Sequence, residues 1–164
     1  MFNRKLPPVS YAIGIWEPQR YFWLFIMFLH CPPRIFFLIL YRRAFRNVAP
    51  KSAVYRQIIY FYMKTMWLEM FGLIAVSVLD IKCSFVMHAA AYSMWIISFN
   101  FNMLFNTILH HYGGMRDTSL KYDVIWRIKL AMFISGAILS ISTAVSYPVF
   151  LAYCFQEGQK TCVS

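Results

Sequence analysis

Four long apolar stretches dominate the sequence and restrict the folds that this chain can adopt. They cover, approximately, Tyr21–Tyr41, Ile58–Leu79, Phe85–Leu109 and Leu130–Phe155. The hydrocarbon core of a bilayer is about 30 Å thick, and a helix needs about 20 apolar residues to cross it. Each stretch is long enough, and the longer ones can tilt. We therefore predict an all-α fold, a polytopic membrane helical bundle of about four transmembrane helices, which forms one membrane domain over residues 1–164.

The positive charge of the chain is concentrated between the apolar stretches. A formal net charge of +10 could suggest nucleic-acid binding, but a chain that is 60% hydrophobic with short basic clusters is typical of a membrane protein. No nucleic-acid partner is therefore expected. Nine basic residues lie in two loops, after the first stretch and after the third: Arg42, Arg43, Arg46, Lys51, Arg56, Arg116, Lys121, Arg127 and Lys129. Five lie on the other side: Arg4, Lys5, Arg20, Lys82 and Lys160. The positive-inside rule then predicts that the two loops face the cytosol.

The first two apolar stretches contain ionisable residues, among them His30, Arg34 and Glu69. His30 and Arg34 are four residues apart and share one helix face. At a rise of about 1.5 Å per residue, Glu69 lies near the depth of His30 and within a turn of Arg34. One interpretation is an Arg34–Glu69 ion pair that sets the register of two helices. The other is a polar pocket, open to the lumen, in which His30 or His88 transfers a proton and Arg34 binds a lipid phosphate.

Other residues predict features of helix shape and packing. Pro32 and Pro33 are expected to bend the first helix, and Pro148 to kink the last. Small residues recur every four positions in the last stretch, which favours a close approach by another helix: Gly136, Ser140 and Ala144.

Neither a metal site nor a cofactor is expected. The four histidines, His30, His88, His110 and His111, do not share a depth, and no Cys/His spacing fits a ligand set. His110 and His111 are interpreted as polar residues at a helix end. The cysteines show no Cys-x-x-Cys spacing. A luminal disulfide between Cys83 and either Cys154 or Cys162 and free, packed thiols are equally open alternatives.

The entry to the first apolar stretch carries a family resemblance. Its motifs are Val-Ser-x-Ala-Ile-Gly at Val9 to Gly14, Pro18-Gln19-Arg20-Tyr21, Trp23, His30 and Pro33-Arg34. They closely resemble the family of post-GPI-attachment-to-proteins factor 2 and its -like proteins, which belongs to a wider membrane family with the DRAM and Sfk groups. Further positions resemble that family more thinly: Glu69, His88, Trp126-Arg127-x-Lys129-Leu130 and Tyr153-Cys154.

The resemblance implies a multi-pass protein of the Golgi membrane, or of the endoplasmic reticulum. Such proteins act in fatty-acid remodelling of GPI anchors during maturation, which supports stable surface expression of GPI-anchored proteins. The expected partners are membrane lipids and GPI-anchored proteins or their lyso-form anchors. The resemblance implies neither an acyl donor nor an oligomeric state. It also does not distinguish an acyltransferase from a factor that assists one, and a non-enzymatic Golgi or ER adaptor or trafficking factor is the alternative.

The residues and the resemblance together select a set of candidate site residues. The candidate catalytic residues are His30, Glu69 and His88, and the candidate lipid-headgroup residues are Gln19, Arg20 and Arg34. The related family domain has one further span before the segment at Val9 and another after Cys154. We therefore expect either a shortened isoform or a divergent member that works with four helices.

Overall fold

The described part of the chain forms four long helices and one short helical turn. The computed structural model describes residues 17–48, 52–79 and 84–156, and within these ranges no strand occurs. The elements are α2 (Glu17–Val48), α3 (Ala53–Val78), α4 (Phe85–Tyr112), the 3₁₀ turn η1 (Arg116–Thr118) and α5 (Leu120–Gln156). The predicted all-α helical fold is confirmed.

Local sequence signals define where the helices begin and end. Ser52 caps α3, because its hydroxyl accepts a hydrogen bond from the backbone N–H of Tyr55 at 3.2 Å. Ser84 caps α4 in the same way. At its other end α4 stops at Gly113 and Gly114, and Gly114 adopts a φ of 70° that other residues rarely take.

Among the described residues, three helical segments are long and apolar enough to cross a membrane: Pro18–Asn47, Ala53–Val78 and Leu120–Ser146. Helix α4 is also long and holds no Asp, Glu, Lys or Arg, but it contains Asn100, Asn102 and Asn106. Each asparagine donates a hydrogen bond to a neighbouring helix, to Ser140, Glu69 and Tyr62 respectively. Amide donors that are paired between helices are compatible with a span, although the buried Oδ1 atoms of Asn100 and Asn106 have no hydrogen-bond partner among the described residues. Helix α4 therefore presents its asparagines to its two neighbours, α3 and α5.

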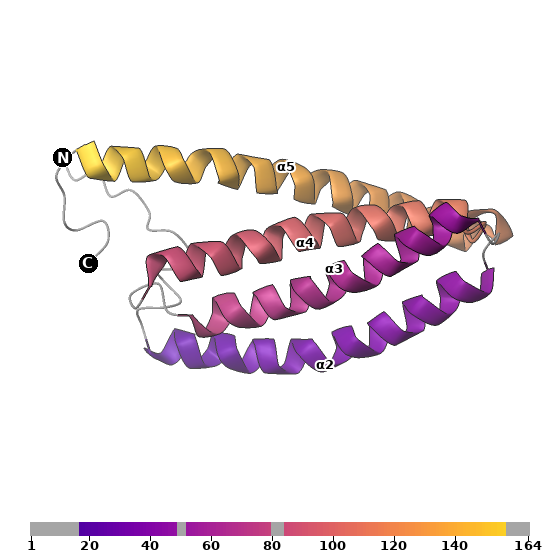
Figure 1. The fold of residues 1–164 in the computed structure, drawn as a ribbon, viewed down its shortest axis with the longest axis horizontal. Coiled ribbons are helices and arrows are strands. Elements are labelled where there is room, and N and C mark those ends of the chain that lie inside the picture. The colour runs from indigo at the N-terminus through magenta and orange to yellow at the C-terminus, as the bar shows by residue number, and fades with distance from the viewer. Residues whose placement is uncertain (1–16, 49–51, 80–83, 157–164) are drawn as a thin grey trace.

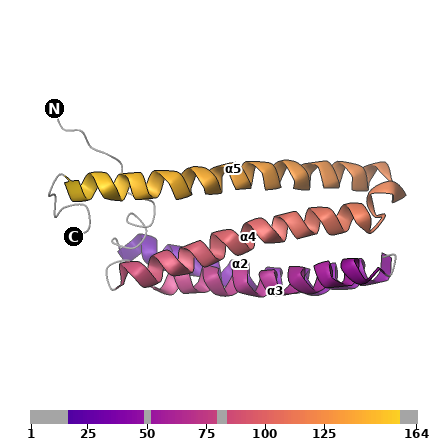
Figure 2. The same cartoon turned by 45° about the horizontal axis from the view of Figure 1, so that its top comes forward.

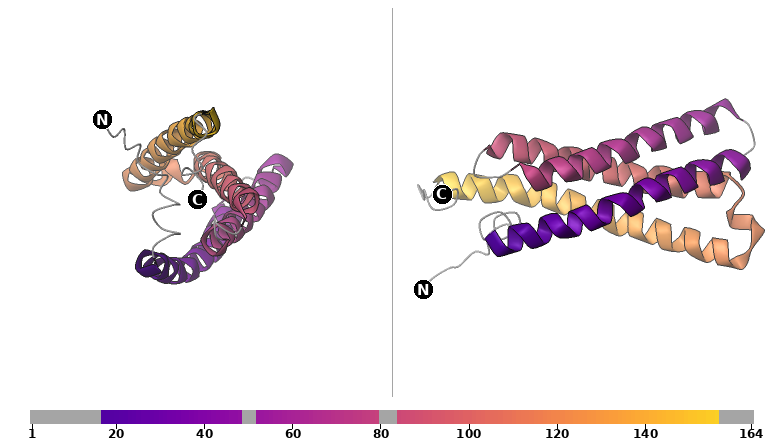
Figure 3. Two further views of the ribbon diagram at one scale, coloured as in Figure 1. Left: turned by 90° about the vertical axis from the view of Figure 1, so that its left-hand side faces the viewer. Right: turned by 90° about the horizontal axis from the view of Figure 1, so that it is seen from below.

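The helices pack in the order of the chain. Helix α4 packs most extensively against α3, and to a lesser extent against α5, while α2 packs against α3. The end-on view in Figure 3 shows a curved row in the order α5, α4, α3 and α2. Neighbours run antiparallel, so the end of α2, the start of α3, the end of α4 and the start of α5 meet at one end of the molecule (Figure 1). We call this the basic end, because both basic loops belong to it. Its orientation toward the cytosol stays a prediction.

The outer surface of the helices is apolar. In the most apolar window of α5 no residue is buried, and in that of α2 very few are. Large side chains such as Phe28 and Leu139 are more than two-thirds exposed. A soluble protein does not leave apolar area of this extent in water. A lipid bilayer is the solvent that accommodates it.

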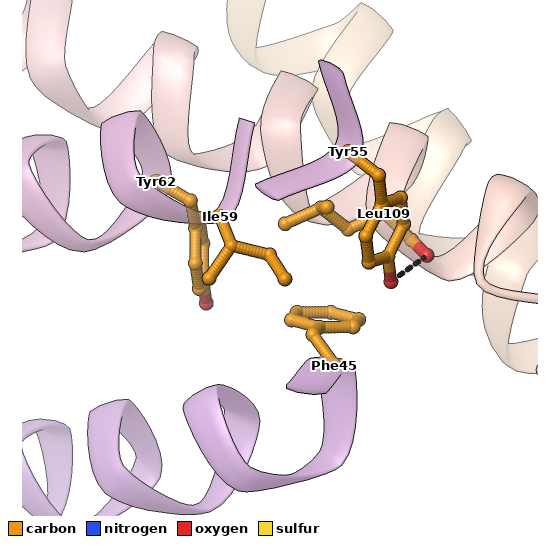
Figure 4. Packing of buried hydrophobic residues seen from close by; sticks show 5 residues of the cluster. All are labelled: Phe45, Tyr55, Ile59, Tyr62 and Leu109. Atoms are coloured by element: carbon orange, nitrogen blue, oxygen red, sulfur yellow. Dashed lines mark hydrogen bonds between the residues drawn. The ribbon is translucent and has the colours of Figure 1, made fainter. Parts of the chain in front are cut away.

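A hydrophobic cluster joins three helices near the basic end. It consists of Phe45 from α2, Tyr55, Ile59 and Tyr62 from α3, and Leu109 from α4 (Figure 4). The Tyr55 hydroxyl donates a hydrogen bond of 3.3 Å to the backbone carbonyl of Leu109. This cluster sets the level at which α2, α3 and α4 are held together.

Helices α4 and α5 are less tightly joined. A Cβ on Gly136 would lie 3.4 Å from the ring of Phe99, and Ser140 accepts a hydrogen bond from Asn100 at 2.8 Å. Ala144, the third member of the small-residue stripe, is exposed. Figure 2 shows that α5 lies close to α4 near η1 and separates from it toward Gln156. The stripe therefore packs against α4 over its first two members.

The prolines lie inside continuous helices, and one cysteine can be described in detail. Helix α2 continues through Pro32 and Pro33 and is curved, and α5 continues past Pro148 (Figure 1). Cys31 is a free, half-buried thiol. The disulfide alternatives fall outside the described part, because Cys83 and Cys162 lie outside the described residues and the side chain of Cys154 is not among those described.

His110 is a polar residue near the end of α4, as interpreted from the sequence, and it also takes part in a junction that Lys129 of α5 forms with α4 and α2. Only 2% of it is exposed. The Lys129 ammonium donates to His110 Nδ1 at 3.3 Å and lies 4.7 Å from the centre of the Tyr41 ring. His110 Nε2 lies 3.2 Å from the carbonyl oxygen of Tyr122. An ammonium can only donate, so His110 accepts at Nδ1 and donates from Nε2, which is the neutral form.

Replacing His110 with alanine is expected to lower the free energy of unfolding by about 1–3 kcal/mol, because Lys129 and the Tyr122 carbonyl both lose a buried partner. Thermal unfolding in lipid–detergent micelles would measure the change. His111→Ala is the matched control, because His111 is exposed and adjacent. Equal losses from the two variants would contradict the role of His110 as a junction.

Candidate functional site

An ion pair joins α2 to α3 in the middle of the molecule. The Arg34 guanidinium donates from Nη1 to Oε1 of Glu69. The Glu69 side chain is 5% exposed and the Arg34 side chain 25% exposed. The pair predicted from helix depths is thus confirmed. Each charge offsets part of the cost of burying the other in an apolar environment.

The second carboxylate oxygen of Glu69 is held from α4. Asn102 donates from Nδ2 to Oε2 of Glu69, and its own Oδ1 lies 2.6 Å from the Thr65 hydroxyl. Both carboxylate oxygens therefore accept hydrogen bonds from neighbouring helices, one from α2 and one from α4. The contribution of Asn102 and Thr65 was not predicted. The signal that points to Asn102 is that an amide deep in a span needs a hydrogen-bond partner.

His30 extends this arrangement on α2. Arg34 donates from Nε to His30 Nε2 at 2.8 Å. The lone pair of Nε2 is thus occupied, and His30 can accept a proton there only after Arg34 Nε turns away. His30 is exposed on the surface of α2. We call His30, Arg34, Glu69, Asn102 and Thr65 the central polar network.

The central polar network is far from both ends of the molecule. Arg34 is 17 residues from the start of α2 and 14 from its last residue. At about 1.5 Å per residue it lies roughly 20 Å or more along α2 from either end. Charges at such a depth are expensive, so they are either paired or used. In this structure Arg34 and Glu69 are paired. The part of the network formed by Arg34 and His30 is partly exposed on the surface of the molecule.

The remaining candidate residues lie at the end opposite the basic end. Gln19 and Arg20 are in the first turn of α2, and Arg20 is 14 residues, or about 21 Å, from Arg34. One phosphate group therefore cannot contact both arginines. His88 is in the first turn of α4, at a similar distance along that helix from Asn102. The structure thus brings His30, Arg34 and Glu69 together and separates them from Gln19, Arg20 and His88.

His88 has a local contact of its own. Its Nδ1 lies 2.8 Å from the carbonyl oxygen of Leu79, which closes the end of α3 onto the start of α4. Its Nε2 is buried and has no hydrogen-bond partner among the described residues. Near the same end, the Trp23 indole N–H donates to the Ser77 hydroxyl at 3.1 Å and ties α2 to α3. A catalytic role of His88 stays a prediction.

The described residues contain no cluster of side chains that could hold a metal ion. There, no three side chains of the His, Cys, Asp or Glu type converge on one point. The chemistry that the central polar network offers is hydrogen bonding, charge pairing and proton transfer.

A known protein family matches a range of the chain that includes all of these helices. The family model described as Frag1/DRAM/Sfk1/Cwh43P N-terminal domain matches residues 1–162. No solved structure matches the chain. The match includes both the central polar network and the basic end, and it confirms the wider membrane family with the DRAM and Sfk groups. The chain therefore belongs to the Frag1/DRAM/Sfk1/Cwh43P N-terminal domain family.

Proposed function

We propose that this chain acts in the fatty-acid remodelling of GPI anchors, in the Golgi membrane or the membrane of the endoplasmic reticulum. One observation carries the proposal. His30, Arg34 and Glu69, which carry part of the resemblance to post-GPI-attachment-to-proteins factor 2, form one hydrogen-bonded network although Glu69 lies 35 residues beyond Arg34. Ionisable groups within a membrane are functional candidates by default.

Arg34 and His30 are coupled in the proposed chemistry. Two of the five N–H donors of Arg34 are used, one for His30 and one for Glu69, and the others can hold a phosphate oxygen of a lyso-form lipid. Anion binding that draws Arg34 Nε away releases the lone pair of His30 Nε2. His30 then accepts the proton of the lipid hydroxyl, the hydroxyl oxygen forms an ester bond with the acyl group of a donor, and the leaving group of the donor takes up a proton.

The depth of the network defines what this mechanism requires. The reacting part of the lipid must reach well below the headgroup level to contact His30, while Gln19 and Arg20 are close to the end of α2. A lipid held by Gln19 and Arg20 alone would leave the central polar network with a structural role. The two arrangements therefore assign the phosphate to different arginines, Arg20 or Arg34.

Complementation of cells that lack GPI-anchor remodelling tests the function. The unaltered chain is expected to restore saturated chains in the anchor lipid, as measured by mass spectrometry. His30→Gln is expected to abolish that restoration at normal protein level, and His111→Gln to retain it, because His111 is exposed near the basic end. No restoration by the unaltered chain contradicts the function. Restoration by His30→Gln contradicts only the role of His30.

A second candidate function is that of a non-enzymatic adaptor or trafficking factor. The observation that favours it is the exposure of Arg42, Arg43 and Arg46, for which the described residues provide no ion-pair partner. In that case, neutralising these arginines with topology preserved abolishes complementation, while His30→Gln complements fully. The same cells and the same lipid measurement thus distinguish the two functions.

A further inference from the structure

The described charges of the molecule are concentrated at the basic end. Eight basic and two acidic residues lie there, a formal excess of six positive charges: Arg42, Arg43, Arg46, Arg56, Arg116, Lys121, Arg127, Lys129, Asp117 and Asp123. Both carboxylate oxygens of Asp123 are occupied, one by Arg116 at 2.5 Å and the other by Arg127 at 2.8 Å. The remaining cations are thus left with little local compensation.

Five of these cations are exposed and form no ion pair within the described ranges. They come from three helices, and we call them the basic surface: Arg42, Arg43 and Arg46 of α2, Arg56 of α3, and Lys121 of α5. Arg42 and Arg46 are four residues apart on one face of α2, where like charges repel. An anion bound between them would remove that repulsion.

A contact between α2 and α5 places the basic surface relative to the membrane. Lys129 lies over the Tyr41 ring, so Arg42 to Arg46 lie beyond this contact on α2, and Lys121 lies beyond it on α5. Aromatic side chains accompany them. Tyr112 is 66% exposed and Tyr122 39% exposed, and Arg116 stacks on the Trp126 ring at 4.1 Å. Tyrosine and tryptophan prefer the level of the lipid headgroups.

We propose that the basic surface binds the phosphate headgroups of anionic phospholipids in the adjoining leaflet. Three observations select this partner. The cations come from three helices at one end of an apolar, lipid-facing body, they lie near exposed aromatic residues, and they have no carboxylate partners in the described part of the chain. Each such charge near an anionic membrane contributes about 1 kcal/mol, which corresponds to about fivefold in binding.

Lipid retention by the purified chain tests the proposal independently of GPI-anchor chemistry. The chain is reconstituted into symmetric bilayers of phosphatidylcholine with a minor fraction of phosphatidylserine, so its orientation does not affect the result. The lipids that remain bound after extraction are quantified by mass spectrometry. The unaltered chain is expected to retain phosphatidylserine in excess of its bulk fraction. High salt is expected to reduce that excess, because salt screens exposed charges.

Three substitutions make the test specific to the surface. Arg42→Gln and Arg46→Gln are each expected to reduce the excess by up to about fivefold. Lys64→Gln is the matched control, because Lys64 is an exposed cation on α3 that stacks on Tyr60, away from the basic surface. The control is expected to leave the excess unchanged. The proposal is overturned by no phosphatidylserine excess in the unaltered chain, by equal losses from Lys64→Gln, or by insensitivity to salt.

Discussion

Glu69→Gln is expected to lower the free energy of unfolding by about 3–5 kcal/mol, because it leaves the Arg34 charge unpaired within an apolar environment. Arg34→Met is expected to cost a similar amount for the opposite reason, since Asn102 is then the one hydrogen-bond donor left to the Glu69 carboxylate among the described residues. The double variant Arg34→Met with Glu69→Gln holds no unpaired charge. It is therefore expected to be less destabilised than the sum of the two single variants.

Unfolding of the four proteins in lipid–detergent micelles completes this double-mutant cycle. A coupling energy of about 1 kcal/mol or more supports a pair that acts as a unit. Additive losses would contradict the ion pair. The cycle also separates two roles. If the double variant is stable but fails to complement remodelling-deficient cells, the pair has a function beyond setting the register of α2 on α3.

Gly72→Val is expected to destabilise the contact between α3 and α4 by about 1–3 kcal/mol, because the new side chain has no space. A Cβ at this position would lie 2.9 Å from the backbone nitrogen of Trp95 and 3.0 Å from its Cα. These are backbone atoms of α4, so the helices themselves must separate. The same shift would weaken the bond between Asn102 of α4 and Glu69 of α3.

Gly136→Ala provides the matched control for this prediction. A Cβ on Gly136 would lie 3.4 Å from a ring atom of Phe99, and a side chain can move more easily than a helix backbone. We expect the control to unfold within about 0.5 kcal/mol of the unaltered chain. Unfolding curves recorded under one condition give the comparison. If the Gly136→Ala variant were as destabilised as the Gly72→Val variant, the close approach of α3 and α4 at Gly72 would be contradicted.

These stability predictions affect how functional variants are chosen. Glu69 and Gly72 are buried, so a loss of activity on their replacement could follow from lost folding alone. His30 is exposed and makes a single hydrogen bond with a described partner, Arg34. His30→Gln is therefore the variant that reports on chemistry with the smallest effect on the fold, and its protein level serves as the check.

The sequence alone determined the class of fold and the main polar contact. Apolar runs predict helices because a span must satisfy its backbone hydrogen bonds internally. The helices extend beyond these runs, as α5 does from Leu120 rather than Leu130, because helical hydrogen bonding continues into polar residues. The Arg34–Glu69 pair was predictable because helix rise converts sequence position into depth, and two antiparallel neighbours then bring equal depths together.

The tertiary structure decided which faces of the helices meet. Depth does not specify the rotation of a helix about its axis, so it could not show that Asn102 points at Glu69 or that Lys129 reaches both His110 and Tyr41. It also could not show that α3 and α4 approach most closely at Gly72. Apolar patterns carry little rotational information in a membrane, because lipid-facing and helix-facing residues are both apolar. For that reason the central polar network was only partly predictable, and its third helix became visible only in the packed structure.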